Sequence, residues 1–162
     1  MKRVADHLAC SHFAEIVGCV VASSMFGMFF TAAAGNALGL PAHLSLALAP
    51  RSVTVARALP IAALLGSGAD ASVTAATVVL TGLIGANFAQ PLLTALRFRD
   101  PVVRGLSTAA SAHGLGTAAL AAKEPEALPV AALAYATMGI VSSLLVAVPQ
   151  FRALLAAVAG AA

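Results

Sequence analysis

The 162-residue chain contains 60% apolar and only 9% charged residues, with a formal net charge of +3. Soluble proteins have about 45–50% apolar residues and a charged face on their helices, so this composition excludes an ordinary soluble domain. The nine basic residues are scattered, without a basic helix face or an aromatic stacking platform, so the positive net charge does not indicate a nucleic-acid-binding protein. Four long stretches lack Asp, Glu, Lys and Arg and indicate an integral membrane protein: residues 16–50, 71–96, 105–122 and 127–151.

The first two membrane segments are expected at residues 14–33 and 43–65. The first ends before Gly35-Asn36, which is a helix-stop signal. The second contains Pro50, and a proline inside a helix removes an amide donor. We therefore predict two short half-helices in the second segment rather than one continuous helix.

Three further segments are expected at residues 72–96, 105–122 and 128–148. Asp100 is expected to cap the helix of the fourth segment, and Pro101 suits its first turn. The fold class is therefore an all-α, polytopic helical membrane protein. It has about five membrane segments, of which the second and the fourth are interrupted.

The fourth segment is polar in its middle. It contains hydroxyl groups, a histidine and two glycines at Ser107, Thr108, Ser111, His113, Gly114, Gly116 and Thr117. Hydrocarbon offers these groups no hydrogen bonds, and each glycine weakens a helix by about 1 kcal/mol, so we do not expect the segment to face lipid. Two explanations remain open. One is a polar contact between closely packed helices, and the other is a substrate pocket, because irregular backbone is tolerated at membrane depth where it lines a cavity.

Two explanations also remain open for the break at Pro50. A half-helix that begins near Ser52 would present free N–H groups and a partial positive charge, and transporters build anion sites from such broken helices. Alternatively, the proline only kinks a helix near the membrane surface, and Arg51 extends into water. Two polar interruptions in one short chain favour the pocket.

The chain has no motif for catalysis, metal binding or cofactor binding. Cys10 and Cys19 would fall on opposite sides of a helix, so a disulfide or metal site between them is not expected. Hydrolysis by Ser111 and His113 would need an orienting acid, whereas the later acidic residues all lie in predicted loops. We therefore expect no enzyme activity, no metal and no cofactor.

The chain resembles the LrgB/CidB membrane family over most of its length, from about residue 14 to residue 149. The most specific part is SAHGLGTA at residues 111–118, which follows an Asp-Pro turn. Further matching stretches are PRSVT at residues 50–54, LTGLIGA at residues 80–86 and RDP at residues 99–101. Two stretches look closest to the plastid members of plants and algae, namely residues 82–88 and 122–129.

The resemblance implies a membrane transporter that exchanges small 2-hydroxycarboxylates, glycolate and glycerate, across the chloroplast inner envelope in photorespiration. Bacterial members imply the alternative function, a holin-like pore or a regulator of murein hydrolase activity in the plasma membrane. The implied partners are small carboxylates and the lipid bilayer, and not nucleic acid.

Family members carry a further membrane half before the region that resembles this chain. We therefore expect residues 1–162 to form a single membrane domain that corresponds to the C-terminal half of such a transporter, with residues 1–13 as a short N-terminal extension. Such folds pair two related halves around the substrate. The chain alone is then expected to show little exchange unless a second copy or the missing half completes the pocket.

The implied substrate site combines hydroxyl groups and half-helix ends from both interrupted segments. Its expected substrate-binding residues are Ser52, Thr54, Ser111, His113, Gly114, Gly116 and Thr117. His113 would contact the substrate or carry a coupled proton, and the two glycines would let the backbone approach the ligand. Arg57 replaces an apolar residue expected in the family, and it either extends to a membrane interface or adds an anion contact.

Five crossings would place the Arg97–Arg104 loop and Arg152 on one side of the membrane. The N-terminus, Asp70 and the loop at residues 123–126 would then lie on the other side. The side of the Arg97–Arg104 loop carries four basic residues, and the side of the N-terminus carries three, or one if the first dozen residues are left out. On the second count, the Arg97–Arg104 loop is expected in the stroma, or in the cytoplasm of a bacterium.

Overall fold

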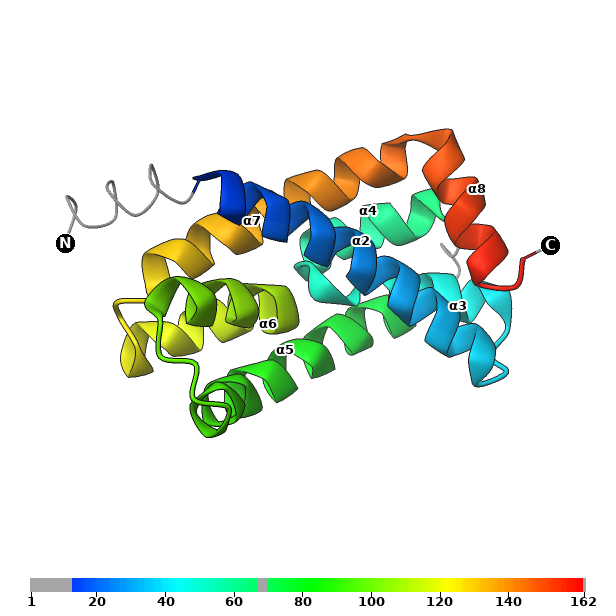
Figure 1. Ribbon diagram of the computed structural model, residues 1–162. Coiled ribbons are helices and arrows are strands. Elements are labelled where there is room, and N and C mark those ends of the chain that lie inside the picture. Colours follow the sequence, from blue (N-terminus) through cyan, green and yellow to red (C-terminus); the bar gives the residue numbers. More distant parts are fainter. Residues whose placement is uncertain (1–12, 67–69, 162) are drawn as a thin grey trace.

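The computed structural model describes residues 13–66 and 70–161, and within these ranges the chain forms helices and no strands. Three helices are long and apolar enough to cross a membrane: α2 (Phe13–Ala37), α5 (Ala71–Ala95) and α7 (Leu128–Ala147). All three run lengthwise through the molecule (Figure 1). They correspond to the first, third and fifth predicted segments, and the predicted all-α membrane fold is confirmed.

The second segment folds back on itself. It consists of α3 (Ala42–Leu48), the 3₁₀ turn η1 (Ala49–Ser52) and α4 (Val55–Leu64), and we call it hairpin 1. Its two ends lie together, because Nε2 of His43 in α3 is 3.8 Å from Oδ2 of Asp70, which follows α4 and precedes the first residue of α5. The predicted break is therefore correct, but the segment does not cross the membrane.

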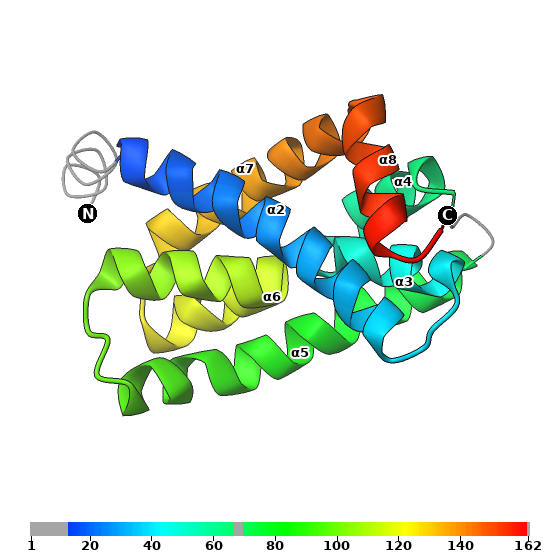
Figure 2. The ribbon, with the colours of Figure 1, turned by 45° about the vertical axis from the view of Figure 1, so that its right-hand side comes forward.

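The fourth segment, α6 (Pro101–Lys123), also reverses its direction. A straight helix of this length would separate its ends by about 33 Å. Instead, Arg104 near its start forms a salt bridge with Glu124 directly after its end. The reversal occurs at His113, where φ is 41° and ψ is −137°, and Figure 2 shows the two arms side by side. We call this segment hairpin 2.

Asp100 begins hairpin 2 as predicted. Its carboxylate accepts hydrogen bonds from the amides of Val102 and Val103 at 2.8 and 3.0 Å, and Pro101 occupies the first helical position. These contacts satisfy two of the amides that have no partner within a helix at its N-terminus.

A short helix, α8 (Pro149–Val158), follows α7 and was not among the predicted elements. Pro149 ends α7 and also occupies the first position of α8, where proline is favoured. The new helix packs across the end of α2. The side-chain amide of Asn36 donates to the carbonyl of Val158 at 3.2 Å, and the rings of Phe29 and Phe151 lie 5.3 Å apart.

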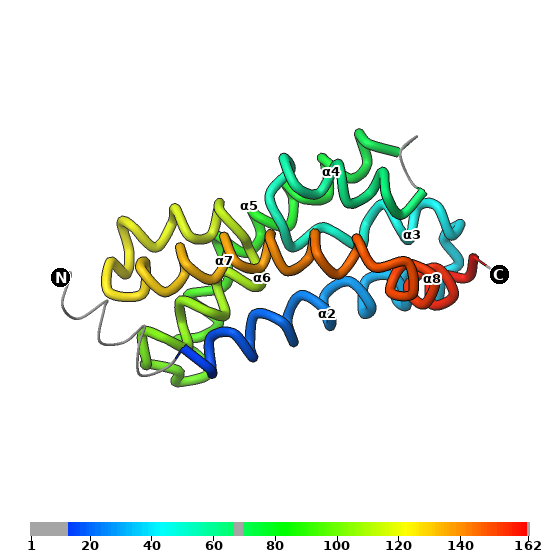
Figure 3. Tube along the Cα trace, turned by 90° about the horizontal axis from the view of Figure 1, so that it is seen from above, coloured from blue at the N-terminus to red at the C-terminus, as the bar shows by residue number. Residues whose placement is uncertain are grey.

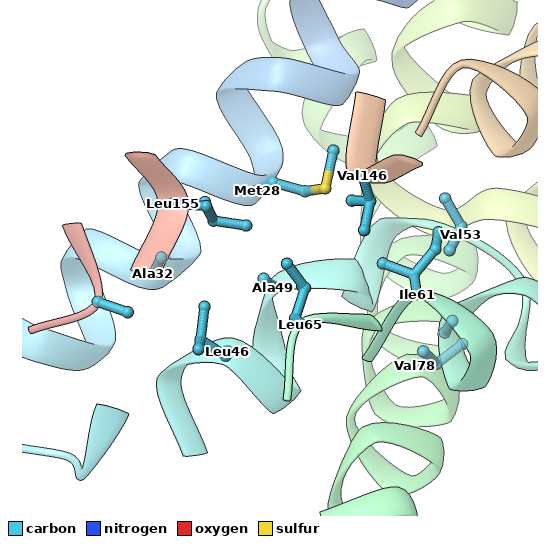
Figure 4. Packing of buried hydrophobic residues seen from close by; sticks show 12 residues of the cluster. Met28, Ala32, Leu46, Ala49, Val53, Ile61, Leu65, Val78, Val146 and Leu155 are labelled. Carbon is cyan, nitrogen blue, oxygen red and sulfur yellow. The ribbon is translucent and has the colours of Figure 1, made fainter. Parts of the chain in front are cut away.

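Two apolar clusters hold the hairpins at opposite ends of the molecule. One cluster joins the second half of α2 to hairpin 1, the end of α7 and α8, through residues such as Met28, Ile61, Val146 and Leu155 (Figure 4). The other joins the first half of α2 to hairpin 2 and the start of α7. The two hairpins therefore enter the bundle from opposite ends, which the view from above also shows (Figure 3).

Three crossings and two hairpins change the expected topology. The Arg97–Arg104 loop lies at the same end as the loop at residues 123–126, because Arg104 binds Glu124. Helix α8, which contains Arg152, lies at the other end of the molecule beside α3 (Figure 1), and His43 of α3 contacts Asp70. The prediction that the Arg97–Arg104 loop shares a side with Arg152 was wrong, because it counted each broken segment as a crossing.

Candidate functional site

The tips of the two hairpins meet in the middle of the bundle. Cγ2 of Thr54 in hairpin 1 lies 3.6 Å from the position that a Cβ on Gly114 in hairpin 2 would occupy. Thr54 is the N-cap of α4, and Gly114 begins the second arm of hairpin 2. Two half-helices therefore begin at the same place and run to opposite ends of the molecule. Both direct their unpaired backbone N–H groups toward the centre.

The first arm of each hairpin ends at the same place, so its carbonyl end offsets part of that positive potential. Arg51 adds a full positive charge beside the tips. Its guanidinium does not extend to a membrane surface, because Nε donates to the hydroxyl of Thr31 in α2 at 2.8 Å. The side chain is half-buried at the tip of hairpin 1.

A pocket of about 280 Å³ lies beside Arg51, between α2, the tip of hairpin 1 and the first arm of hairpin 2. Its polar lining consists of the guanidinium and four serines: Ser23, Ser52, Ser107 and Ser111. A second, mainly apolar pocket of about 430 Å³ extends from it along α5 and shares Arg51, Ser107 and Ser111. One cation and several hydroxyl groups can bind a small anion that also carries hydroxyl groups.

Two of the expected site residues, Ser52 and Ser111, line the 280 Å³ pocket. Ser52 lies against α2, where its hydroxyl is 3.4 Å from the Cβ position of Gly27. The Ser111 hydroxyl donates to the carbonyl of Ser107 at 2.8 Å. Its oxygen can still accept a hydrogen bond from a ligand.

Thr54 and Gly114 lie at the contact between the tips but do not line either pocket described above. The Cβ position of Gly114 faces Thr54 and, at 3.9 Å, Cε2 of Tyr135 in α7. The side chains of Thr54 and Tyr135 therefore lie against the backbone of Gly114.

His113, Gly116 and Thr117 are buried inside the packing of hairpin 2. Nε2 of His113 is 2.9 Å from the carbonyl oxygen of Val78 in α5, and only 4% of the residue is exposed. Thr117 donates to the carbonyl of His113 at 2.9 Å. A side chain on Gly116 would overlap Ala112 in the opposite arm. These three residues hold the hairpin together and against α5.

Arg51, Ser107 and Ser23 were not among the expected site residues. Ser107 and Ser111 are four residues apart, a spacing that puts both on one face of a helix and could have indicated Ser107. No signal in the sequence indicates Ser23, which lies in another helix.

Arg57 lies at mid-depth rather than at a membrane interface. Its Cδ and Nε lie 2.6 and 3.0 Å from the Cβ position of Gly139, near the middle of α7. Of the two explanations given for Arg57, extension to an interface is therefore excluded.

The fold and the site together define a class: a polytopic helical membrane protein in which broken helices from opposite faces meet around a cationic, hydroxyl-lined pocket. The chain belongs to the LrgB-like family, whose model matches residues 6–150.

The chain is similar to two proteins of very different origin. It is 55% identical over 149 residues to plastidal glycolate/glycerate translocator 1 of Arabidopsis thaliana, covering 92% of this chain and 29% of that protein. It is 31% identical over 111 residues to the uncharacterized protein YxaC of Bacillus subtilis, covering 68% of this chain and 47% of that protein. The chain thus spans less than half the length of either relative. No solved structure matches it.

Proposed function

We propose that this chain forms the substrate-binding part of a carrier that exchanges small 2-hydroxycarboxylates, glycolate and glycerate, across the inner chloroplast envelope. The observation that carries the proposal is the pocket beside the hairpin tips, in which Arg51 lies among serine hydroxyls. The name of the Arabidopsis relative supports the substrate and the plastid location. Broken helices that meet near the midplane are a recurrent carrier architecture.

The proposed binding mode assigns a different group to each part of the substrate. The guanidinium of Arg51 holds the carboxylate, because its planar fork matches two carboxylate oxygens. Ser52, Ser107 and Ser111 bind the 2-hydroxyl group and, in glycerate, the 3-hydroxyl group. A substrate without a 2-hydroxyl group leaves these serines without that partner and is bound more weakly.

The test is counter-exchange in proteoliposomes that contain the polypeptide in the form its gene encodes. The vesicles are loaded with glycerate, and the uptake of labelled glycolate is measured against its concentration. We expect saturable uptake that requires internal glycerate. Acetate, which lacks the hydroxyl group, should compete poorly. Uptake that is proportional to concentration and indifferent to internal glycerate would indicate the holin-like pore instead.

Arg51→Lys tests the proposed carboxylate contact. Lysine keeps the charge but not the two-pronged geometry, so we expect KM to rise about tenfold or more. This corresponds to the roughly 1.5–3 kcal/mol of a hydrogen bond to a charged group. Arg99→Ala, which removes a cation from a surface loop, is the matched control and should leave KM unchanged. Equal KM values for the Arg51→Lys variant and the wild type would exclude Arg51 from the site.

A further inference from the structure

Arg57 carries an exposed positive charge at mid-depth on the outer face of the bundle. Its stem crosses Gly139, and its guanidinium carbon lies 3.8 Å from the Cβ position of that glycine. Gly139 is buried near the middle of α7, whereas Arg57 itself is exposed. A side chain at Gly139 would displace the arginine, so the glycine provides the groove in which the stem lies.

The surroundings of Arg57 are those of a surface that contacts apolar neighbours. The exposed residues nearest in sequence to Arg57 and to its contact Gly139 on the same helix faces are Ala56 and Pro60 on α4 and Ala136 and Ile140 on α7. Within the described ranges, Arg57 has no hydrogen bond or salt bridge. An arginine held at this depth against hydrocarbon costs at least about 2.5–3.5 kcal/mol unless it is paired.

A second copy of these residues does not offer a carboxylate at this depth. Every acidic residue within the described ranges lies at the end of a membrane segment: Glu15, Asp70, Asp100, Glu124 and Glu126. The Arg51 pocket lies on another side of the hairpin tip, toward α2 and α5. A matching anion therefore has to come from another helix.

We propose that the Arg57 face, formed by Ala56, Arg57 and Pro60 of α4 and Ala136 and Ile140 of α7, binds a membrane helix that presents an Asp or Glu side chain near its middle. That helix comes from outside the described residues. Its carboxylate pairs with the guanidinium, and its apolar side chains cover the small residues around it. Small residues let two membrane helices approach closely, which strengthens such a contact.

Model helices test this pairing without reference to transport. A Leu/Ala-rich membrane peptide with one central Glu, and a matched peptide with Gln, each carry an acceptor dye. The chain carries the donor dye in vesicles of neutral phosphatidylcholine at about pH 8. Energy transfer should half-saturate at a peptide-to-lipid ratio at least tenfold lower for the Glu peptide. Equal half-saturation ratios for the two peptides would overturn the proposal.

Arg57→Leu provides the matched loss of charge on a face that is already apolar, so the fold is expected to persist. This variant should bind the Glu and Gln peptides equally. Arg152→Leu, which removes a cation at the membrane surface, should keep the wild-type preference for Glu. A preference that survives in Arg57→Leu would show that another group binds the peptide, and would also overturn the proposal.

Discussion

His113 has a backbone conformation that side-chain-bearing residues rarely adopt. Its φ of 41° and ψ of −137° resemble the first central residue of a type II′ turn, a position dominated by glycine. The side chain offsets this strain by bonding α5. Because a carbonyl can only accept, Nε2 carries the proton that is donated to Val78. The histidine thus links the tip of hairpin 2 to the spanning helix beside it.

Two separate variants, His113→Ala and His113→Gly, distinguish the cost of the strained backbone from the contribution of the hydrogen bond. His113→Ala loses the hydrogen bond and keeps the strained backbone, whereas His113→Gly loses the same bond but relieves the strain. We expect both variants to melt below the wild type in detergent, and the glycine variant to be about 1 kcal/mol more stable than the alanine variant. Stability of His113→Ala equal to that of the wild type would contradict the structural role argued for this residue.

Some residues of the candidate site were predictable from the sequence, and others were not. The serine and histidine pattern at residues 107–117 indicates a polar segment, but not which groups line a cavity. In the fold, Ser111 faces the pocket while His113, two residues later, faces α5. The sequence around Pro50 is compatible with an Arg51 side chain that extends into water. Only tertiary packing brings Thr31, twenty residues earlier, within hydrogen-bond distance.

Hairpin 2 is held at its open end by one buried cation. Besides its salt bridge with Glu124, the guanidinium of Arg104 donates to the carbonyls of Phe98 and Gln90 and to the hydroxyl of Thr94. It thereby connects both arms of the hairpin to the end of α5. Since Ser107 lies one turn after Arg104, this clamp also fixes part of the pocket.

The pH dependence of the clamp follows from Glu124. The hydrogen bond from Arg104 lowers the pKa of Glu124 from its ordinary value. A carboxylate whose pKa is lower in the folded state stabilises the fold fully above its unfolded-state pKa of about 4.3, and this contribution is lost as the pH falls through the lowered pKa. We therefore expect the melting temperature to fall as the pH drops below about 4.3.

Glu124→Gln is the variant that isolates this effect. The change should reduce stability at pH 7 by about 1–3 kcal/mol, because Arg104 loses its charged partner. It should also flatten the acid-induced fall in melting temperature. Glu126→Gln, in the same loop, serves as the control and should keep the wild-type profile. An acid profile of Glu124→Gln identical to that of the wild type would mean that other carboxylates cause the fall.

Elements were predictable from the sequence where hydrophobicity alone determines them. Uncharged stretches gave α2, α5 and α7 to within a few residues. Breaks in the other two segments were also visible, from Pro50 and from the glycines after His113. The direction of the chain after each break was not predictable, because proline and glycine indicate an interruption but do not distinguish a kink from a reversal. The reversal depends on contacts between distant residues, such as the salt bridge between Arg104 and Glu124.

At the scale of the whole molecule, the two hairpins reduce the expected five crossings to three and thereby reverse the direction of α5. Three crossings put the start of α2 opposite the end of α7 and place both loops that flank hairpin 2 on one side. Within the described residues, that side carries four basic residues, Arg97, Arg99, Arg104 and Lys123, and the other side carries Arg152 alone. The positive-inside rule therefore predicts that the side with four basic residues faces the cytoplasm, or the stroma in a plastid envelope.

Cysteine labelling distinguishes this topology from one with five crossings. Single cysteines replace Phe98, Glu126 and Gln150 in a Cys10→Ser/Cys19→Ser background, and sealed vesicles are treated with a maleimide that cannot cross the membrane. We expect positions 98 and 126 to react from the same side and position 150 from the other. With five crossings, position 98 would instead react together with position 150, and position 126 would be on the other side.

The opposed hairpins also determine how the chain is built into a membrane. A spanning helix can insert alone because its apolar surface suits lipid, but hairpin 2 carries buried hydroxyls, a histidine and a buried arginine that lipid cannot satisfy. Its partners lie on α5, which precedes it, and on α7, which follows it. We therefore expect hairpin 2 to enter the membrane only after α7 has been synthesised. On this expectation, insertion of the chain ends with the docking of hairpins from opposite faces and is not a series of independent helix insertions.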